Sequence, residues 1–318
     1  MSKHHPRLSL IVPCFNEEDS VRPLYEASIA ALSALGLPFE LILVDDGSTD
    51  ATCANLAAIA RLDPRVRIVR FRRNYGQTAA MAAGIAHARA EIVVTMDGDL
   101  QNDPADIGTF LAKLDQGFDI VVGWRANRQD KFWTRKVPSR IANWIIGKVT
   151  GVPIKDNGCS LKAFRAAVIK QIPLYSEMHR FIPAMASIAG PRIAEVETRH
   201  HARRFGQSKY GLSRIYKVLL DLMVIKTLAT FASRPLRWFV LLGIPFALVG
   251  TAAIVHALWS WAMPGGSVPL PVAGTGMILL MSAVLLFSSG ALAELIYNLG
   301  DVRDDDFSRL TARVRRPL

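Results

Sequence analysis

The sequence lacks the motifs on which several common protein classes depend. Its 3 cysteines form no C-x-x-C pair, so we expect neither a disulfide framework nor a zinc site. Its 7 histidines include no H-E-x-x-H pattern. No G-x-G-x-x-G follows the first apolar run, and no G-x-x-x-x-G-K-[ST] occurs anywhere. These absences argue against a dinucleotide-dependent oxidoreductase and against a P-loop nucleotide hydrolase.

A long apolar run is also missing at the N-terminus. The first one starts at Leu8 and ends at Pro13, so we expect no cleavable signal peptide. The 318 residues are enough for one ordinary domain and something more. The chain carries a formal net charge of +11 and yet has a mean hydropathy of +0.23. A chain that is both basic and apolar points to a membrane with anionic lipid rather than to nucleic acid.

Apolar runs and helical patterns alternate five times in the first part of the chain. The runs cover residues 8–12, 39–44, 66–71, 91–95 and 119–123, and they are apolar on both faces. This pattern is typical of a Rossmann-like α/β domain, in which helices cover both faces of a parallel sheet. Further along, we expect a turn into a short helix over residues 156–165 and an edge strand over residues 193–199.

The stretch 96–104 directly follows the fourth of these strands. Asp97 and Asp99 are two residues apart, so in an extended chain they face the same side. Gly98 between them leaves room for a ligand to approach the backbone. Two carboxylates suit Mg²⁺ or Mn²⁺, which usually complete their shell with substrate phosphates. Asn102 or Asp103 then caps the next helix.

Polar clusters follow two other predicted strands. Asn16 and Glu17 come after the first, and Asp45, Asp46 and Ser48 come after the second. Parallel sheets bind ligands beyond the carboxyl ends of their strands. Turn chemistry could explain any one cluster, but three clusters at one edge predict a functional site.

Two stretches are rich in positive charge. Residues 124–140 contain six Arg and Lys residues, and residues 203–210 form a basic loop with a glycine. The first stretch could be a solvated loop, a membrane-facing loop or a clamp for phosphates, and we favour the clamp because guanidinium groups bind phosphates bidentately. In the second, Arg203 and Lys209 would suit a pyrophosphate.

The C-terminal third is strongly apolar. Residues 212–231 read as an interfacial helix, although packing on the sheet is an alternative. Residues 238–263 and 274–299 are each long enough to span a membrane, with Pro245 expected to kink the first. No Lys or Arg lies between Trp238 and Val302, so the positive-inside rule places both ends of this hairpin in the cytoplasm. Glu294 either reaches the interface or contacts another subunit.

Together these motifs resemble a known family. The series V-P-C-F-N-E, V-D-D-G-S, N-Y-G-Q, M-D-G-D-L-Q-N-D-P, G-W-R and R-x-x-G-x-S-K is similar to that of family-2 glycosyltransferases, and within them to dolichol-phosphate mannose synthases and bacterial polyprenyl-phosphate glycosyltransferases. The resemblance implies a cytoplasmic catalytic domain of the GT-A type over residues 1–211. An interfacial helix over 212–233, a membrane hairpin over 234–300 and a basic cytoplasmic tail over 301–318 would follow.

The resemblance also implies roles for individual residues. The metal on the diphosphate would be held by Asp97, Asp99 and Gln101, beside Gly98. The nucleotide pocket would be lined by Pro13, Phe15 and Glu17, with Asp45 or Asp46 reading the base or ribose. Arg125 and Arg135, with Ser139, would approach the phosphates. Arg203 and Lys209 would close over the pyrophosphate. Asp156 matches an aspartate sometimes assigned as the base, but it could instead orient the acceptor.

The activity implied is inverting transfer of a hexose to polyprenyl phosphate, either undecaprenyl or dolichyl, from a UDP- or GDP-linked sugar with Mg²⁺ or Mn²⁺. We expect a multi-pass protein of the cytoplasmic membrane that binds no nucleic acid, and we keep both a monomer and a homo-oligomer open. One alternative is a processive polysaccharide synthase, but Arg234 replaces the glutamine of its Q-x-x-R-W motif. Another is a non-catalytic nucleotide-sugar-binding membrane protein, but the metal motif is intact.

Overall fold

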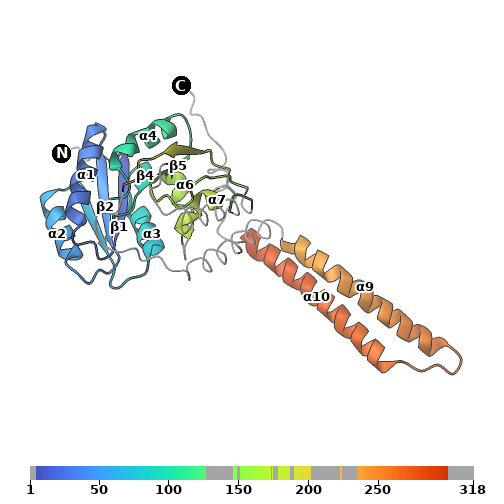
Figure 1. The fold of residues 1–318 in the computed structure, drawn as a ribbon. Helices are drawn as coiled ribbons and strands as arrows, with labels where there is room; N and C mark the ends of the chain where they lie inside the picture. The colour runs from blue at the N-terminus through green and yellow to red at the C-terminus, as the bar shows by residue number, and fades with distance from the viewer. Residues whose placement is uncertain are drawn as a thin grey trace. The chain divides into compact units, whose positions relative to one another are not determined.

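A computed structural model describes most of the chain and divides it into two compact units. One unit holds a seven-stranded sheet, and the other holds two long helices (Figure 1). The described residues are 5–126, 146–148, 151–172, 174, 178–186, 190–201, 223 and 235–299.

The sheet has the strand order β3-β2-β1-β4-β6-β5-β7. Its strands are β1 (Leu8–Cys14), β2 (Phe39–Asp45), β3 (Val66–Arg70), β4 (Ile92–Thr95), β5 (Ile120–Trp124), β6 (Lys162–Arg165) and β7 (Ile193–Glu197). All pairings among them are parallel except those of β6. The five predicted parallel strands and the edge strand near residue 193 are therefore confirmed.

Strand β6 corrects one prediction. We expected residues 156–165 to be a turn into a short helix, but Lys162–Arg165 form a strand, and helix α6 (Ala166–Ile169) starts only after it. β6 lies between β4 and β5 and runs antiparallel to both, so the sheet is mixed. This strand is difficult to predict from its sequence, K-A-F-R, because its first and last residues are charged. Lys162 is nevertheless buried.

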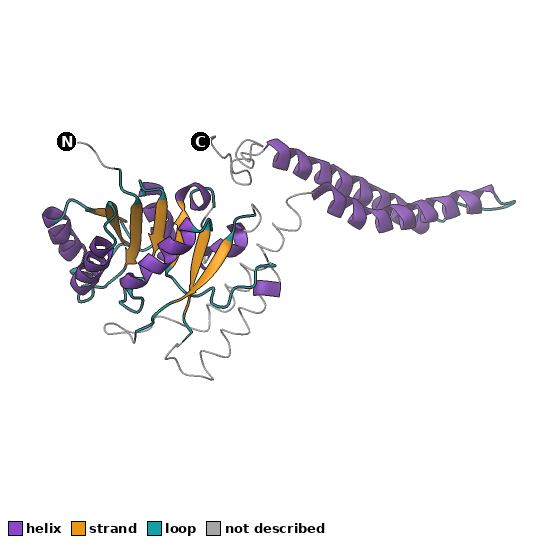
Figure 2. Cartoon of the chain, turned by 90° about the horizontal axis from the view of Figure 1, so that it is seen from above, coloured by secondary structure: helices purple, strands orange, loops and turns teal. Residues whose placement is uncertain are grey.

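Helices cover both faces of the sheet (Figure 2). On one face the buried apolar side chains come from helices α1 (Val21–Ala34), α2 (Thr52–Leu62) and α4 (Ile107–Asp115). On the other they come from α3 (Gln77–His87), α6 and α7 (Ile182–Ala186). Two short 3₁₀ turns, η1 (Pro104–Asp106) and η3 (Met178–Arg180), complete the unit. Asp103 caps η1, as predicted, because its side chain accepts a hydrogen bond from the Ala105 amide.

The second unit is a hairpin of two helices, α9 (Pro235–Ala262) and α10 (Leu270–Leu299). Both are long and apolar enough to cross a membrane, and most of their large apolar side chains are exposed. Helix α9 runs through Pro245 without ending. The two helices pack closely, since a Cβ on Gly250 would lie 3.0 Å from the Gly276 carbonyl oxygen.

Glu294 has a partner within the chain. Its Oε2 accepts a hydrogen bond of 3.2 Å from the backbone N–H of Leu236, at the start of α9. The first N–H groups of a helix have no partner inside the helix, and a carboxylate there is favourable. Glu294 thus caps the neighbouring helix, a role that the sequence did not reveal. The predicted interfacial helix over 212–233 and the basic tail over 301–318 lie outside the described residues, apart from residue 223.

Candidate active site

The site lies where the strand order reverses. β1 pairs with β2 on one side and with β4 on the other, and ligands of open α/β sheets bind beyond the carboxyl ends of strands at such a point. The turns after β1 and β4 pack tightly there, since a Cβ on Gly98 would lie 3.1 Å from the Pro13 carbonyl oxygen. Gly98 therefore has a packing role: it lets the Asp97–Asp99 turn approach the end of β1.

Asp97 lies at the centre of this edge. Gln77, the first residue of α3, donates a hydrogen bond of 2.5 Å from its side-chain amide to Asp97 Oδ1. Burial raises the pKa of Asp97 to about 6, and the negative charge of Asp99 adds to that rise. A hydrogen bond with Ser160 and the charges of Lys162 and Arg125 act in the opposite direction. The two cations therefore offset only part of the rise that burial and Asp99 cause in the pKa of Asp97.

Asp99 and Gln101 form the next turn. Asp99 Oδ1 accepts a hydrogen bond of 3.2 Å from the Gln101 amide, and Leu100 between them has a positive φ of 60°. Among the described residues, no three His, Cys, Asp or Glu side chains come together as a metal-binding group. The mutual repulsion of Asp97 and Asp99 nonetheless fits a divalent cation, because that charge would relieve it. Phosphate and water oxygens would have to complete the shell, as Mg²⁺ commonly requires.

The turns after β1 and β2 are tied to each other. The side-chain oxygen of Asn16 accepts a hydrogen bond of 2.9 Å from the Thr49 backbone N–H. The backbone N–H of Asn16 donates a hydrogen bond of 3.0 Å to Ser48 Oγ. Asn16 has a positive φ of 54°, which asparagine tolerates better than most residues. Glu17 accepts a hydrogen bond from the Ser20 hydroxyl and so steadies the start of α1. Two of the three predicted polar clusters therefore do lie together.

Asp45 and Asp46 are both buried, and each has partners in the protein. Asp46 accepts hydrogen bonds from Asn74 Nδ2 at 3.0 Å and from the amides of Tyr75 and Gly76 at 2.8 and 2.9 Å. Burial raises the pKa of Asp46 in spite of these bonds. Asp45 accepts a hydrogen bond of 3.0 Å from the amide of Ser48. The N-Y-G-Q motif is thus anchored to the end of β2 through Asp46.

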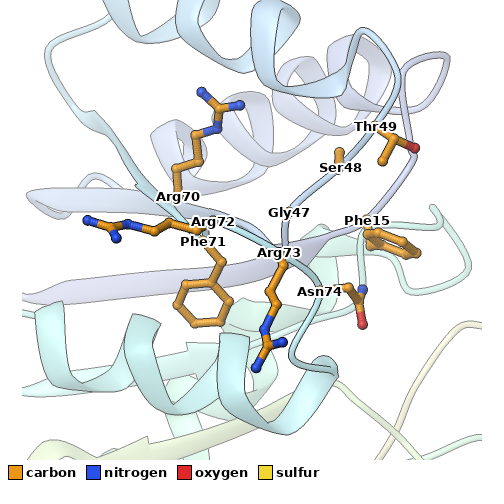
Figure 3. Close-up of a pocket in the computed structure, with 9 residues that line it drawn as sticks. All are labelled: Phe15, Gly47, Ser48, Thr49, Arg70, Phe71, Arg72, Arg73 and Asn74. Atoms are coloured by element: carbon orange, nitrogen blue, oxygen red, sulfur yellow. The ribbon is translucent and has the colours of Figure 1, made fainter.

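A pocket of about 300 Å³ lies beside these turns (Figure 3). Figure 3 shows Phe15 and Asn74 close together on one side, while the guanidinium groups of Arg70, Arg72 and Arg73 point in three different directions. Gly47 lets the walls meet, because a Cβ there would lie 2.3 Å from the Arg73 carbonyl carbon. The pocket is lined by Phe15, Gly47, Ser48, Thr49, Arg70, Phe71, Arg72, Arg73 and Asn74. Of these, Phe15 was expected to line the nucleotide pocket and Ser48 belonged to a polar cluster of the predicted site, whereas Arg70, Arg72 and Arg73 were not predicted.

Arg125 follows β5 and forms an ion pair with Asp156. The guanidinium Nε lies 2.7 Å from Asp156 Oδ2, and Nη2 lies 2.9 Å from Oδ1. Both side chains are largely buried, with exposed fractions of 13% and 8%. The carboxylate raises the pKa of Arg125 although burial opposes the charge. Asp156 and Arg125 were both predicted as site residues, but their pairing was not.

Three further polar residues, Lys162, His179 and Thr78, are connected by hydrogen bonds and were not predicted as site residues. Lys162 Nζ donates to the carbonyl oxygens of Asn157 and His179, at 3.3 and 3.4 Å. The His179 ring nitrogen Nδ1 lies 2.6 Å from the Thr78 hydroxyl. Nothing in the local sequence joins Thr78 to His179, which are 101 residues apart. The remaining predicted site residues lie outside the described part of the chain: Arg135, Ser139, Arg203 and Lys209.

The chain is similar to known proteins of one family. The family model for Glycosyl transferase family 2 matches residues 9–174. A dodecaprenyl-phosphate galacturonate synthase from Rhizobium johnstonii is 46% identical over 294 residues, which are 91% of this chain and 87% of that protein. An undecaprenyl-phosphate 4-deoxy-4-formamido-L-arabinose transferase from Edwardsiella ictaluri is 39% identical over 249 residues, 78% of this chain and 75% of that protein.

The fold also has solved counterparts. A crystal structure of glucosyl-3-phosphoglycerate synthase from Mycobacterium tuberculosis, in complex with Mn²⁺, UDP and phosphoglyceric acid, superposes with a TM-score of 0.53. It is 19% identical in sequence, and the match covers 70% of this chain and 78% of that one. At this identity the likeness shows the fold alone.

Proposed function

Because the chain belongs to glycosyl transferase family 2, we propose that it transfers a hexose from a nucleotide-diphosphate sugar to polyprenyl phosphate, with inversion at the anomeric carbon. Two relatives that match most of this chain are named for sugar transfer to dodecaprenyl or undecaprenyl phosphate. Inversion needs a single displacement, so no carboxylate nucleophile is required.

One observation carries this proposal: an acidic pair and a buried arginine share the carboxyl edge of the sheet. Asp97 follows β4 and Arg125 follows β5, and each influences the pKa of the other. A diphosphate with a metal ion suits the acidic side, and an acceptor phosphate suits the guanidinium. Donor and acceptor would then meet over strand β6, which lies between β4 and β5.

The donor nucleotide is assigned to the pocket beside the β1 and β2 turns. Pro13, Phe15 and Glu17 are proposed to contact the nucleoside, and Phe15 offers an aromatic ring to the pocket. Of the two aspartates, Asp45 remains the better candidate for the base or ribose, because Asp46 already accepts three hydrogen bonds from residues 74–76.

A divalent cation, Mg²⁺ or Mn²⁺, would be held by Asp97 and Asp99, with Gln101 adjacent. When bound, it would neutralise the departing diphosphate. The protein's own residues act around it: Gln77 orients Asp97, and the positive charges of Arg125 and Lys162 favour its ionised form. Arg203 and Lys209 are proposed to close over the pyrophosphate.

The acceptor phosphate is assigned to Arg125, together with Arg135 and Ser139. Its second pKa is about 6 by analogy with phosphorylated side chains, so it is largely a dianion near neutral pH. A strong general base is then unnecessary. We therefore assign Asp156 to holding Arg125 rather than to removing a proton.

The hairpin of α9 and α10 is proposed to span the cytoplasmic membrane, with residues 1–211 and both termini in the cytoplasm. Residues 212–233 would lie in the interface. The sheet unit would then be on the cytoplasmic side of the membrane, and the lipid phosphate would have to be presented on that side.

The test is direct. Membranes that contain the protein are incubated with UDP- and GDP-linked sugars, UDP-galacturonic acid among them, and with undecaprenyl, dodecaprenyl or dolichyl phosphate. We expect one combination to give a labelled lipid-linked sugar whose anomeric configuration is opposite to that of the donor. A water-soluble polysaccharide as the product would instead indicate a processive synthase, and no product from any combination would refute the proposal.

A further inference from the structure

Lys162 is a buried cation, and the proposed reaction has so far given it only an electrostatic influence on Asp97. Only 3% of the residue is exposed. It is the first residue of β6, and it lies opposite Thr95 of β4 on one side and Val122 of β5 on the other. It therefore lies between the strand that leads to Asp97 and the strand that leads to Arg125.

The ammonium group joins two segments that flank the site. It donates to the carbonyl oxygen of Asn157, the residue after Asp156, and to that of His179 in η3. Both distances, 3.3 and 3.4 Å, are within hydrogen-bonding range but long. One lysine thus holds the loop that carries Asp156 against the turn that carries His179.

From each segment a further hydrogen bond leads to one half of the site. On the donor side, the His179 ring bonds to Thr78, whose neighbour Gln77 donates to Asp97. On the acceptor side, Asn157 adjoins Asp156, which binds Arg125 with both oxygens. Lys162 is the residue at which these two series of contacts meet.

A lysine costs more to bury than an apolar residue of similar volume, unless opposite charges surround it. Around Lys162 the acidic side chains are Asp97 and Asp156, with the thiol of Cys159 nearby, and the opposing cation is Arg180. An apolar side chain could fill the same space, but it could not bind two carbonyl groups from separate segments.

We propose that Lys162 is a positioning residue, which fixes the acceptor-side pair Asp156–Arg125 relative to the donor-side carboxylate Asp97. The inference rests on the proposed function, because it assumes that the two halves bind the two substrates. It does not require Lys162 to touch either substrate.

The experiment compares Lys162→Gln, Lys162→Arg and a control, Lys170→Gln, in the full-length protein in detergent. Lys170 also donates to a backbone carbonyl, that of Ala88, at 2.7 Å, but it is not among the site residues described above. Three quantities are measured for each variant: kcat for sugar transfer, the Kd for UDP or GDP with Mn²⁺, and the melting temperature.

We expect Lys162→Gln to lower kcat by on the order of 10²-fold, the scale of a misplacement of about 1 Å at a reacting centre. The nucleotide Kd should stay within about twofold of wild type, because the donor pocket is formed elsewhere. Lys162→Arg keeps the charge and the donors, so kcat should recover to within about tenfold of wild type. Lys170→Gln should leave kcat unchanged.

A second variant tests the same inference if Lys162→Gln does not fold. Thr78→Val removes the hydroxyl that meets His179 and leaves Lys162 in place, so it should lower kcat with the nucleotide Kd preserved. The inference is overturned if Lys162→Gln transfers sugar at the wild-type rate, or if kcat and nucleotide affinity fall together in both variants. The proposed function fails separately, if the wild-type protein transfers no sugar to any polyprenyl phosphate.

Discussion

Asp156 presents both carboxylate oxygens to the Arg125 guanidinium, with Nε at 2.7 Å and Nη2 at 2.9 Å. A carboxylate engaged in this way is a poor proton acceptor, because protonation would break a largely buried ion pair. The same contact fixes the plane of the guanidinium, and so fixes how Arg125 can meet a phosphate.

Asp156→Asn should therefore lower the rate of sugar transfer by a similar factor at pH 6 and at pH 8. If Asp156 were a base, the loss would be smaller at pH 8, where the acceptor phosphate is already a dianion. Initial rates with polyprenyl phosphate at the two pH values distinguish the roles. A loss confined to pH 6 would restore the base assignment.

Replacing a carboxylate of the acidic pair should abolish metal-dependent turnover. Asp97→Asn or Asp99→Asn removes one of two charged ligands, and with it charge stabilisation of the diphosphate worth on the order of 10²–10³ in rate. Asp115→Asn is a matched control, because that exposed carboxylate pairs with Arg7 at 3.7 Å and belongs to no predicted motif. Activity of folded Asp97→Asn at the wild-type level without metal would show that the ligand assignment is wrong.

Lysine should not be able to replace the arginines of the two basic stretches without loss of activity. Arg135→Lys and Arg203→Lys keep the charge but remove the planar pair of donors, so each should lower turnover by on the order of 10²-fold or more. Arg316→Lys, outside every motif, should be neutral. Rates are compared in membranes that contain equal amounts of each variant. Equal rates for all three would mean that only bulk charge matters.

The free energy of unfolding should depend on pH through the ionisation of Asp63. Hydrogen bonds from Arg65 lower the pKa of Asp63 from 3.8 to about 2. Burial opposes this shift, and a hydrogen bond from Tyr25 adds to it. Because the folded-state pKa is depressed, this stabilisation is complete above pH 4 and is lost as the pH falls towards 2. Asp63→Asn should thus lower the free energy of unfolding by about 2 kcal/mol at pH 7.

The check is denaturant unfolding of wild type and Asp63→Asn between pH 7 and pH 3. The difference between the two proteins should shrink as the medium becomes more acidic. Asp115→Asn should cost less than about 1 kcal/mol throughout, because its ion pair is exposed. A difference for Asp63→Asn that is independent of pH would assign the effect to packing instead.

Topology gives a prediction that needs no substrate. Reporters fused at Met1 and at Leu318 should both lie in the cytoplasm, and one inserted at Gly266, between α9 and α10, should lie outside. Protease protection or cysteine labelling in intact cells shows on which side of the membrane each position lies. A cytoplasmic position for Gly266 would refute the membrane-spanning hairpin.

The parallel strands and their polar ends were predictable from sequence for a physical reason. Buried parallel strands are apolar on both faces, so they stand out as continuous runs, and the turn that follows each one must be polar. That reasoning located Asn16 and Asp97 at strand ends, whereas Phe15 was expected beside the nucleotide only from the family resemblance. It also predicted the Asp103 cap, because capping depends only on neighbouring residues.

The remaining features depend on contacts between distant residues. Strand β6 is recognisable only from its position between β4 and β5, since Lys162 reads as an exposed residue. The pairing of Arg125 with Asp156 joins residues 31 apart, and that of Thr78 with His179 joins residues 101 apart. No local pattern encodes such pairs, because they depend on the tertiary fold.

The direction of β6 has a consequence for how this family can diversify. β5 ends at Trp124, and β6 begins at Lys162 on the same edge of the sheet, so both ends of the intervening chain are fixed at the edge that carries the proposed site. Closing a chain segment between fixed ends costs only about 0.6 kcal/mol more for each doubling of its length. Insertions and deletions here could therefore change which acceptor is accepted while the sheet and the donor pocket stay the same.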